Sequence, residues 1–180
     1  MTEETVSATT TISTSAETVF ATLADPSRHA AIDGTGWVRD SLDGQRLTGS
    51  GQIFRMAMYH DNHPDGSYEM ANRVLAFEPP RAISWEPGYV SPATGKLESG
   101  GWIWRYDLTT QLGPDETKVT LSYDWSAVGP IPRQYIQFPP FTADHLGNSL
   151  SHLAAIVALT TSRPPQARAT NGPEVRNSRG

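Results

Sequence analysis

The most informative hydrophobic pattern lies near the end of the chain, between Phe141 and Thr161. Apolar residues recur there at spacings of four, three and four, which is the stripe that an amphipathic helix buries. We expect this segment, with Thr142 as its N-cap, to form the only long helix and to pack on a sheet. At about twenty residues the helix would be roughly 30 Å long, enough to cross one small sheet. The stripe consists of Leu146, Leu150, Leu153 and Val157.

Most of the preceding chain alternates between apolar and polar residues, which predicts β-strands. Turn-forming pairs such as Asp43-Gly44, Asp65-Gly66 and Pro87-Gly88 separate the strands, so the simplest arrangement is an antiparallel meander. The predicted strands are Thr5–Ser13, Gly36–Leu42, Gln52–Tyr59, Ser67–Phe77, Arg81–Trp85, Gly101–Gln111 and Thr117–Trp125.

Two short helices should follow the first strand. Ser15 has the side chain of an N-cap, and Asp25-Pro26 ends the first helix. The second helix is expected over Ser27–Ile32. Later in the chain, Gly129–Pro140 carries four prolines, which predicts a stiff connector that is neither helix nor inner strand.

Length and composition indicate a single domain over residues 1–162, large enough to bury a core without disulfides. Residues 163–180 are rich in Pro, Gly, Asn and Arg, and we expect a disordered basic tail there. The chain has no cysteine, which excludes thiol catalysis and a disulfide framework. It shows no secretory leader and no apolar run long enough to span a bilayer, so we expect a cytoplasmic protein without membrane insertion.

The charge distribution argues against nucleic acid as a partner. Residues 1–162 carry ten Lys or Arg against eighteen Asp or Glu, and the tail carries four Arg against one Glu. An acidic body without a basic cluster is unsuited to tracking phosphates. No nucleophile elbow, phosphate-binding glycine loop or dinucleotide fingerprint occurs, so no cofactor is expected.

Several segments match one family pattern in order along the chain: Ile12–Phe20 with Leu23–Pro26, Phe77–Arg81 with Ile83–Trp85, Trp104–Leu108, Thr117–Thr120 and Tyr123–Ser126. Over about residues 5–162 the chain thereby resembles the helix-grip, START-like (SRPBCC) superfamily, in its polyketide cyclase/dehydrase-like branch. The resemblance implies an α+β fold in which a curved antiparallel sheet of roughly six to seven strands wraps around a long C-terminal helix. It also implies a hydrophobic-ligand cavity between helix and sheet, and no shared set of catalytic residues.

Aromatic residues alternate along two predicted strands and mark a candidate ligand-binding wall. One strand places Trp102, Trp104 and Tyr106 on one face, and the next does the same with Tyr123 and Trp125. Such a wall suits a flat or lipidic ligand, although an ordinary aromatic core would have the same pattern. The complete set of candidate ligand-binding residues is Trp85, Trp102, Trp104, Tyr106, Tyr123, Trp125, Ser149 and His152.

Three charged residues on the predicted strands leave their orientation open. Strict alternation would turn Arg73 and Glu69 inward together with Leu75, and Arg55 competes with its apolar neighbours for the inner face. An inward guanidinium could polarise a carbonyl, but charged residues on half-exposed strands usually face solvent, which we favour.

Histidines occur at two places of interest. His60 and His63 lie just before the hairpin tip at Pro64-Asp65-Gly66. At first glance they resemble a metal cluster, but no third His or Cys is near in the sequence, so we interpret them as loop residues and expect no metal. His145 and His152 lie two turns apart on the predicted long helix, beside its apolar stripe. We regard His152 as the better candidate for proton transfer, next to Ser149.

Three hypotheses about function follow. The first is binding of a hydrophobic or aromatic small molecule, lipid or polyketide-like, between sheet and helix. The second is a cofactor-independent cyclase or dehydratase, in which Arg55 or Arg73 polarises a carbonyl and His152, Tyr106 or Tyr123 transfers protons. The third is a protein-interaction module with a filled cavity. Whether the chain is an enzyme, and whether it forms a homodimer, stays open at this point.

Overall fold

The structure is a computed structural model that describes residues 3–110 and 113–161. Helices occur in three places, namely after the first strand, in the connector and at the end of the described chain. The elements are β1 (Thr5–Ile12), α1 (Ala16–Leu23), the 3₁₀ turn η1 (Pro26–Arg28), α2 (His29–Ile32), β2 (Val38–Ser41), β3 (Ile53–Tyr59), β4 (Ser67–Glu78), β5 (Ala82–Val90), β6 (Leu97–Ser99), β7 (Ile103–Thr110), β8 (Thr117–Asp124), α3 (Pro132–Tyr135) and α4 (His145–Thr161).

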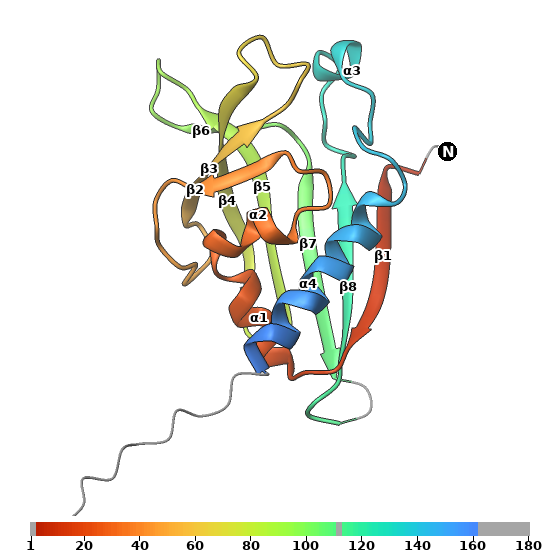
Figure 1. The fold of residues 1–180 in the computed structure, drawn as a ribbon. Coiled ribbons are helices and arrows are strands. Elements are labelled where there is room, and N and C mark those ends of the chain that lie inside the picture. The colour runs from red at the N-terminus through yellow and green to blue at the C-terminus, as the bar shows by residue number, and fades with distance from the viewer. Residues whose placement is uncertain (1–2, 111–112, 162–180) are drawn as a thin grey trace, which may run out of the picture.

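The strands form one antiparallel sheet in the order β1-β8-β7-β5-β4-β3-β2, with the short β6 paired to β5. The sheet curves around α4, which packs on β1 and β8, while α1 packs on β5 and β7 (Figure 1). The predicted α+β helix-grip fold is therefore confirmed. The two short helices after the first strand are present, and the Ser15 side chain caps the first of them by accepting from Thr18 N.

Alternation along the strands determines which side chains face α4. Burial in β8 alternates residue by residue, and Leu121 and Tyr123 of this strand pair with Tyr106 and Trp104 of β7. The aromatic and aliphatic sides of these strands face inward, as their sequence pattern predicts. The residues between these inward-facing positions, such as Arg105 of β7 and Lys118 of β8, lie on the outer face.

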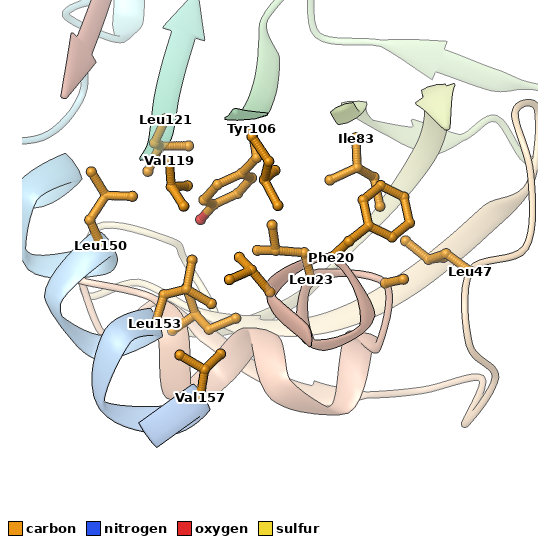
Figure 2. Close-up of a cluster of buried hydrophobic side chains, with 14 of the residues drawn as sticks. Phe20, Leu23, Leu47, Ile83, Tyr106, Val119, Leu121, Leu150, Leu153 and Val157 are labelled. Carbon is orange, nitrogen blue, oxygen red and sulfur yellow. The ribbon is translucent and has the colours of Figure 1, made fainter. Parts of the chain in front are cut away.

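The apolar stripe of α4 forms core along the whole helix, from Leu146 in its first turn to Val157. Leu146, Leu150, Leu153 and Val157 are all buried. Figure 2 shows Leu150 and Leu153 facing Val119 and Leu121 of β8, with Leu23 of α1 beside them. Burying each of these aliphatic side chains contributes about 1.5–3 kcal/mol of apolar transfer free energy, so this stripe is primarily structural.

Four local predictions differ from the structure. The strand predicted to end at Trp85 continues to Val90 through Pro87-Gly88, because Gly88 lets the backbone of β6 approach: a Cβ there would lie 2.1 Å from the Glu98 carbonyl oxygen. The strand β6 was not expected, and the connector contains the single helical turn α3. The helix α4 begins at His145 rather than at Phe141. The tail predicted for residues 163–180 lies outside the described residues.

Candidate functional site

The N-terminal end of α4 meets an aromatic cluster on the inner face of the sheet. Trp104 of β7 lies next to Tyr123 of β8, with ring centroids 4.5 Å apart, and next to Phe141 at 5.6 Å. His145, the first residue of α4, contacts the rings of both Phe141 and Trp104. Trp104 and Phe141 are only half-buried, whereas the opposite end of the grip is closed by aliphatic side chains.

His145 carries a buried nitrogen without a hydrogen bond. Its side chain is 6% exposed, and Nδ1 is the buried side-chain nitrogen or oxygen without a partner in the described part of the chain. Nδ1 faces the backbone of Gly34, where an added Cβ would lie 2.8 Å away. Burial lowers the pKa of His145, mainly because desolvation penalises the charged ring. His145 is therefore neutral at pH 7.

Asp33, which caps the C-terminus of α2, brings a carboxylate close to this cluster. Its oxygens accept hydrogen bonds from the Thr35 amide and hydroxyl and from the Val38 amide, which fixes the connection to β2. The negative charge helps to raise the pKa of Tyr106, although burial is the larger cause. It also acts on His145, where it opposes the effect of burial on the pKa without overcoming it. Asp33 is thus a negatively charged side chain close to the candidate site.

Two buried tyrosines lie on the inner face of the sheet, Tyr106 in the cluster around Leu150 and Leu153 and Tyr123 in a second cluster with Trp125 and Val128. Burial raises the pKa of Tyr106 and of Tyr123 well above the ordinary value, so both phenols keep their protons. Neither hydroxyl has a hydrogen-bond partner among the described residues.

Sequence reasoning missed His29, which lies under the sheet in the short helix α2. Its ring stacks on Trp85 with centroids 5.0 Å apart, and its Nε2 lies 2.8 Å from the carbonyl oxygen of Leu23. Burial lowers the pKa of His29, so the neutral ring donates its N–H to that carbonyl. A single histidine in a four-residue helix has no periodic signal that could have revealed this position.

The catalytic roles considered for Arg55 and Arg73 are not supported by their positions. Arg55 lies on the outer face of β3 and pairs with Asp43 at 2.8 Å. Arg73 lies on the outer face of β4, where it pairs with Glu86 at 3.3 Å and contacts the Leu97 carbonyl. Glu69 is exposed on the same face. The orientation toward solvent is confirmed, because alternation places Phe54 and Val74 on the inner side instead.

The structure exposes His152, the histidine preferred from the sequence, and buries His145. His152 is exposed on α4, with Nδ1 3.3 Å from the Ile32 carbonyl oxygen. Ser149 is buried as expected, but its hydroxyl oxygen accepts from the Gly34 amide at 3.0 Å, which gives it a structural role. Without His152, Arg55 or Arg73 facing inward, the cyclase mechanism as formulated from the sequence loses its proton-transfer histidine and its polarising cation.

The remaining candidate residues lie around the inner space. Trp85 contacts Tyr106 and His29, with centroids 6.0 and 5.0 Å apart. Trp125 packs against Tyr123, and Trp102 packs against Phe138 of the connector. Their role in binding a ligand stays a prediction.

The histidines of the β3–β4 turn, His60 and His63, accept hydrogen bonds from backbone amides of that turn. Nδ1 of His60 accepts from the Asn62 amide at 3.0 Å, and Nδ1 of His63 accepts from the Asp65 amide at 3.3 Å. Over residues 3–110 and 113–161, no group of three or more His, Asp or Glu side chains is placed to hold a metal ion.

Two open hollows lie away from this inner cluster. One follows the outer face of the sheet along Leu75, Ile103 and Arg105, and the other lies near Arg39 and Tyr59. Burial shifts the pKa of Tyr106, Tyr123 and His145 on the inner side, and that of Tyr68 beside the hollow near Arg39. We place the candidate site at the inner cluster, where three of these four groups lie. None of the described helices is both long and apolar enough to cross a bilayer.

Comparison with known proteins shows the fold and little more. No protein-family model matches the chain. Uncharacterized protein Rv0088 of Mycobacterium tuberculosis is 29% identical over 126 residues, which are 70% of this chain and 50% of that protein. The chain thus spans about half the length of this curated relative.

Solved structures of other bacterial proteins superpose on most of the chain. Protein Ms6760 from Mycobacterium smegmatis has a TM-score of 0.60 at 16% identity, over 87% of this chain and 92% of that one. The AHSA1-like protein from Aeromonas hydrophila has a TM-score of 0.54 at 16% identity, over 87% of this chain and 94% of that one. At such identities the likeness establishes a shared helix-grip fold, without a specific branch or ligand.

Proposed function

We propose that the chain binds a hydrophobic or aromatic small molecule, lipid or polyketide-like, between the N-terminal end of α4 and the inner face of the sheet. The observation that carries the proposal is the contrast between the two ends of the grip. Leu153 and Val157 close one end as a dry aliphatic core. The other end holds half-buried aromatic rings and polar atoms that have no partner within the described residues.

The chemistry of the aromatic end suits a flat ligand. Trp104 and Phe141 offer ring faces for stacking, while Tyr123, which packs against both rings, offers a hydroxyl that can orient a bound molecule. Ligand sites in proteins combine an apolar lining with a few converging polar groups in the same way. A ligand would enter between the half-buried rings of Trp104 and Phe141.

Native mass spectrometry of the purified protein tests the proposal, because a retained ligand adds a defined mass. Tryptophan fluorescence during titration with prodan, a neutral naphthalene ketone dye, locates the binding. Quenching should decrease in Trp104→Phe and persist in Trp37→Phe, since Trp37 lies beside His60 and away from the cluster. No added mass together with no response to prodan or to medium-chain lipids would overturn the proposal.

A further inference from the structure

The strand β1 forms one free edge of the sheet. It pairs with β8 on one side, and no described strand pairs with its other side (Figure 1). The Trp125 amide donates to the Glu4 carbonyl at 2.9 Å, so Glu4 and every second residue after it bond to β8. The residues between them direct their N–H and C=O groups away from β8. These outward residues are Thr5, Ser7, Thr9 and Thr11, all of them exposed.

The two edges of the sheet differ in how they are protected against further pairing. Edge strands are usually short, charged, bulged or interrupted by proline, which prevents another chain from adding to them. The edge strand β2 has four residues, includes Arg39 and Asp40, and shifts its register against β3. The eight residues of β1 include no charge, proline or glycine, and their register against β8 is continuous. The β1 edge is therefore open to another strand.

The β1 edge is complementary to a second copy of itself. In an antiparallel pair with Ala8 opposite Ala8, every outward residue meets another outward residue. Thr5 then lies opposite Thr11, and Ser7 lies opposite Thr9. Each such pair exchanges two backbone hydrogen bonds, which gives roughly eight in total, a number within the range of ordinary protein interfaces.

This register also keeps like charges apart. The carboxylates nearest to the β1 edge in the sequence belong to Glu3 and Glu4, which directly precede the strand. In the antiparallel pair they lie opposite Ser13 and Ile12 of the second copy, so no two acidic residues meet across the pair. The facing side chains on the outer face are threonine and serine, a combination that stabilises antiparallel strands.

We propose that two copies of the chain associate through β1, antiparallel about a two-fold axis at Ala8, and form one continuous sheet. The contact is one strand wide and smaller than a standard interface, so the dimer should dissociate on dilution. The association uses the edge of the sheet and is independent of the binding function proposed above.

Sedimentation velocity from about 1 μM to about 1 mM tests the proposal, because the sedimentation coefficient should rise as the dimer forms. Ser7→Pro removes an outward N–H and no hydrogen bond to β8. It should raise the dissociation constant of the dimer at least about tenfold, since the two-fold axis doubles the loss to two hydrogen bonds. Ser7→Ala keeps the N–H and is the matched control, which should associate like the parent protein. Circular dichroism checks that both variants are folded.

A cysteine at the two-fold axis tests the register without disturbing the edge. The chain has no cysteine of its own, so Ala8→Cys introduces a single thiol. The two Cα atoms at position 8 would be about 4.5 Å apart, within the range for a disulfide. Air oxidation with copper phenanthroline should yield a covalent dimer of Ala8→Cys and leave Thr109→Cys, which is exposed on the inner strand β7, monomeric.

Three results would overturn the proposal. The first is a monomer over the whole concentration range. The second is a dimer that Ser7→Pro does not weaken, because the contact would then lie elsewhere. The third is the absence of a covalent dimer of Ala8→Cys, because the strands would then not meet at the axis.

Discussion

The imidazole of His145 lies directly against the backbone of Gly34. A Cβ atom at position 34 would lie 2.8 Å from Nδ1 of His145 and 2.6 Å from its carbonyl oxygen. One turn further along α4, the Ser149 hydroxyl accepts from the Gly34 amide at 3.0 Å. The packing and the hydrogen bond together connect the α2–β2 loop to the first turns of α4. They also fix the position of Asp33, which precedes Gly34 in that loop.

Replacing Gly34 with alanine should therefore destabilise the fold. The methyl group has no room beside the His145 backbone, so α4 or the loop must shift, at a cost of about 1–3 kcal/mol. Urea unfolding monitored by circular dichroism measures the change. Gly147→Ala is the matched control in α4: a Cβ there meets nothing within 4 Å, and alanine should stabilise the helix by about 0.5–1 kcal/mol. Equal stability of Gly34→Ala and the parent protein would show that the contact is not tight.

Two hydrophobic patterns were enough to predict which residues face the core: alternation along the strands, and spacings of four and three along the last helix. They placed Tyr106, Leu121 and Tyr123 on the inner face and the stripe around Leu153 in the core, because burial repeats along each element. The outward orientation of Arg55 followed from the cost of burying a charge.

The contacts that build the site could not be predicted in the same way. The approach of Gly34 to His145 joins segments far apart in the sequence, and nothing near either residue signals it. As a result, the exposed His152 was ranked above the buried His145. Similarly, Pro87-Gly88 has the local chemistry of a turn, but pairing with β6 keeps these residues in an extended strand.

Acidification should weaken the fold because of His29. Its pKa is lowered from the ordinary value of 6.5 by burial, with the Leu23 carbonyl and the charge of Asp25 opposing the shift. The unfolded chain then takes up a proton first, so stability is full above about pH 6.5 and is lost as pH falls toward the lower pKa of the folded state. Urea unfolding at pH 7.5, 6.5 and 5.5 should show this decline.

A matched pair of variants tests whether His29 causes this loss of stability at low pH. His29→Gln should lower stability at pH 7.5 and reduce its dependence on pH, leaving the part due to His145, whose pKa burial also lowers. His152→Gln, which changes an exposed imidazole, should retain the parent dependence. An unchanged slope in His29→Gln would mean that this ring does not titrate on unfolding.

The aliphatic end of the grip should supply stability. Leu153→Ala removes a fully buried side chain between α4 and the sheet and should cost about 2–5 kcal/mol in the free energy of unfolding. Leu159→Ala, on the same helix but 78% exposed, should change it by less than about 0.5 kcal/mol. Thermal unfolding of both variants checks the difference, and similar losses would contradict the assignment of the core.

The outer arginines should be dispensable for ligand binding. Arg55→Gln and Arg73→Gln each remove an ion pair at the sheet surface, where water screens the charges, so stability should change little. Because neither guanidinium reaches the inner face, the affinity for prodan should stay within roughly twofold of the parent value, an allowance for indirect effects. Loss of binding in either variant, with the fold intact by circular dichroism, would reopen a role for these residues.

Phe141 should contribute directly to ligand affinity. Its ring lies 5.6 Å from that of Trp104 and 4.7 Å from that of His145, so it completes the aromatic end of the site. Aromatic pairs of this kind contribute about 0.5–1.5 kcal/mol beyond burial, and Phe141→Ala should accordingly weaken binding of prodan roughly three- to tenfold in the fluorescence titration. Tyr135→Ala removes a ring that is 83% exposed from the same connector and should leave the affinity unchanged. If both variants bind like the parent protein, the ligand does not occupy the aromatic end of the grip.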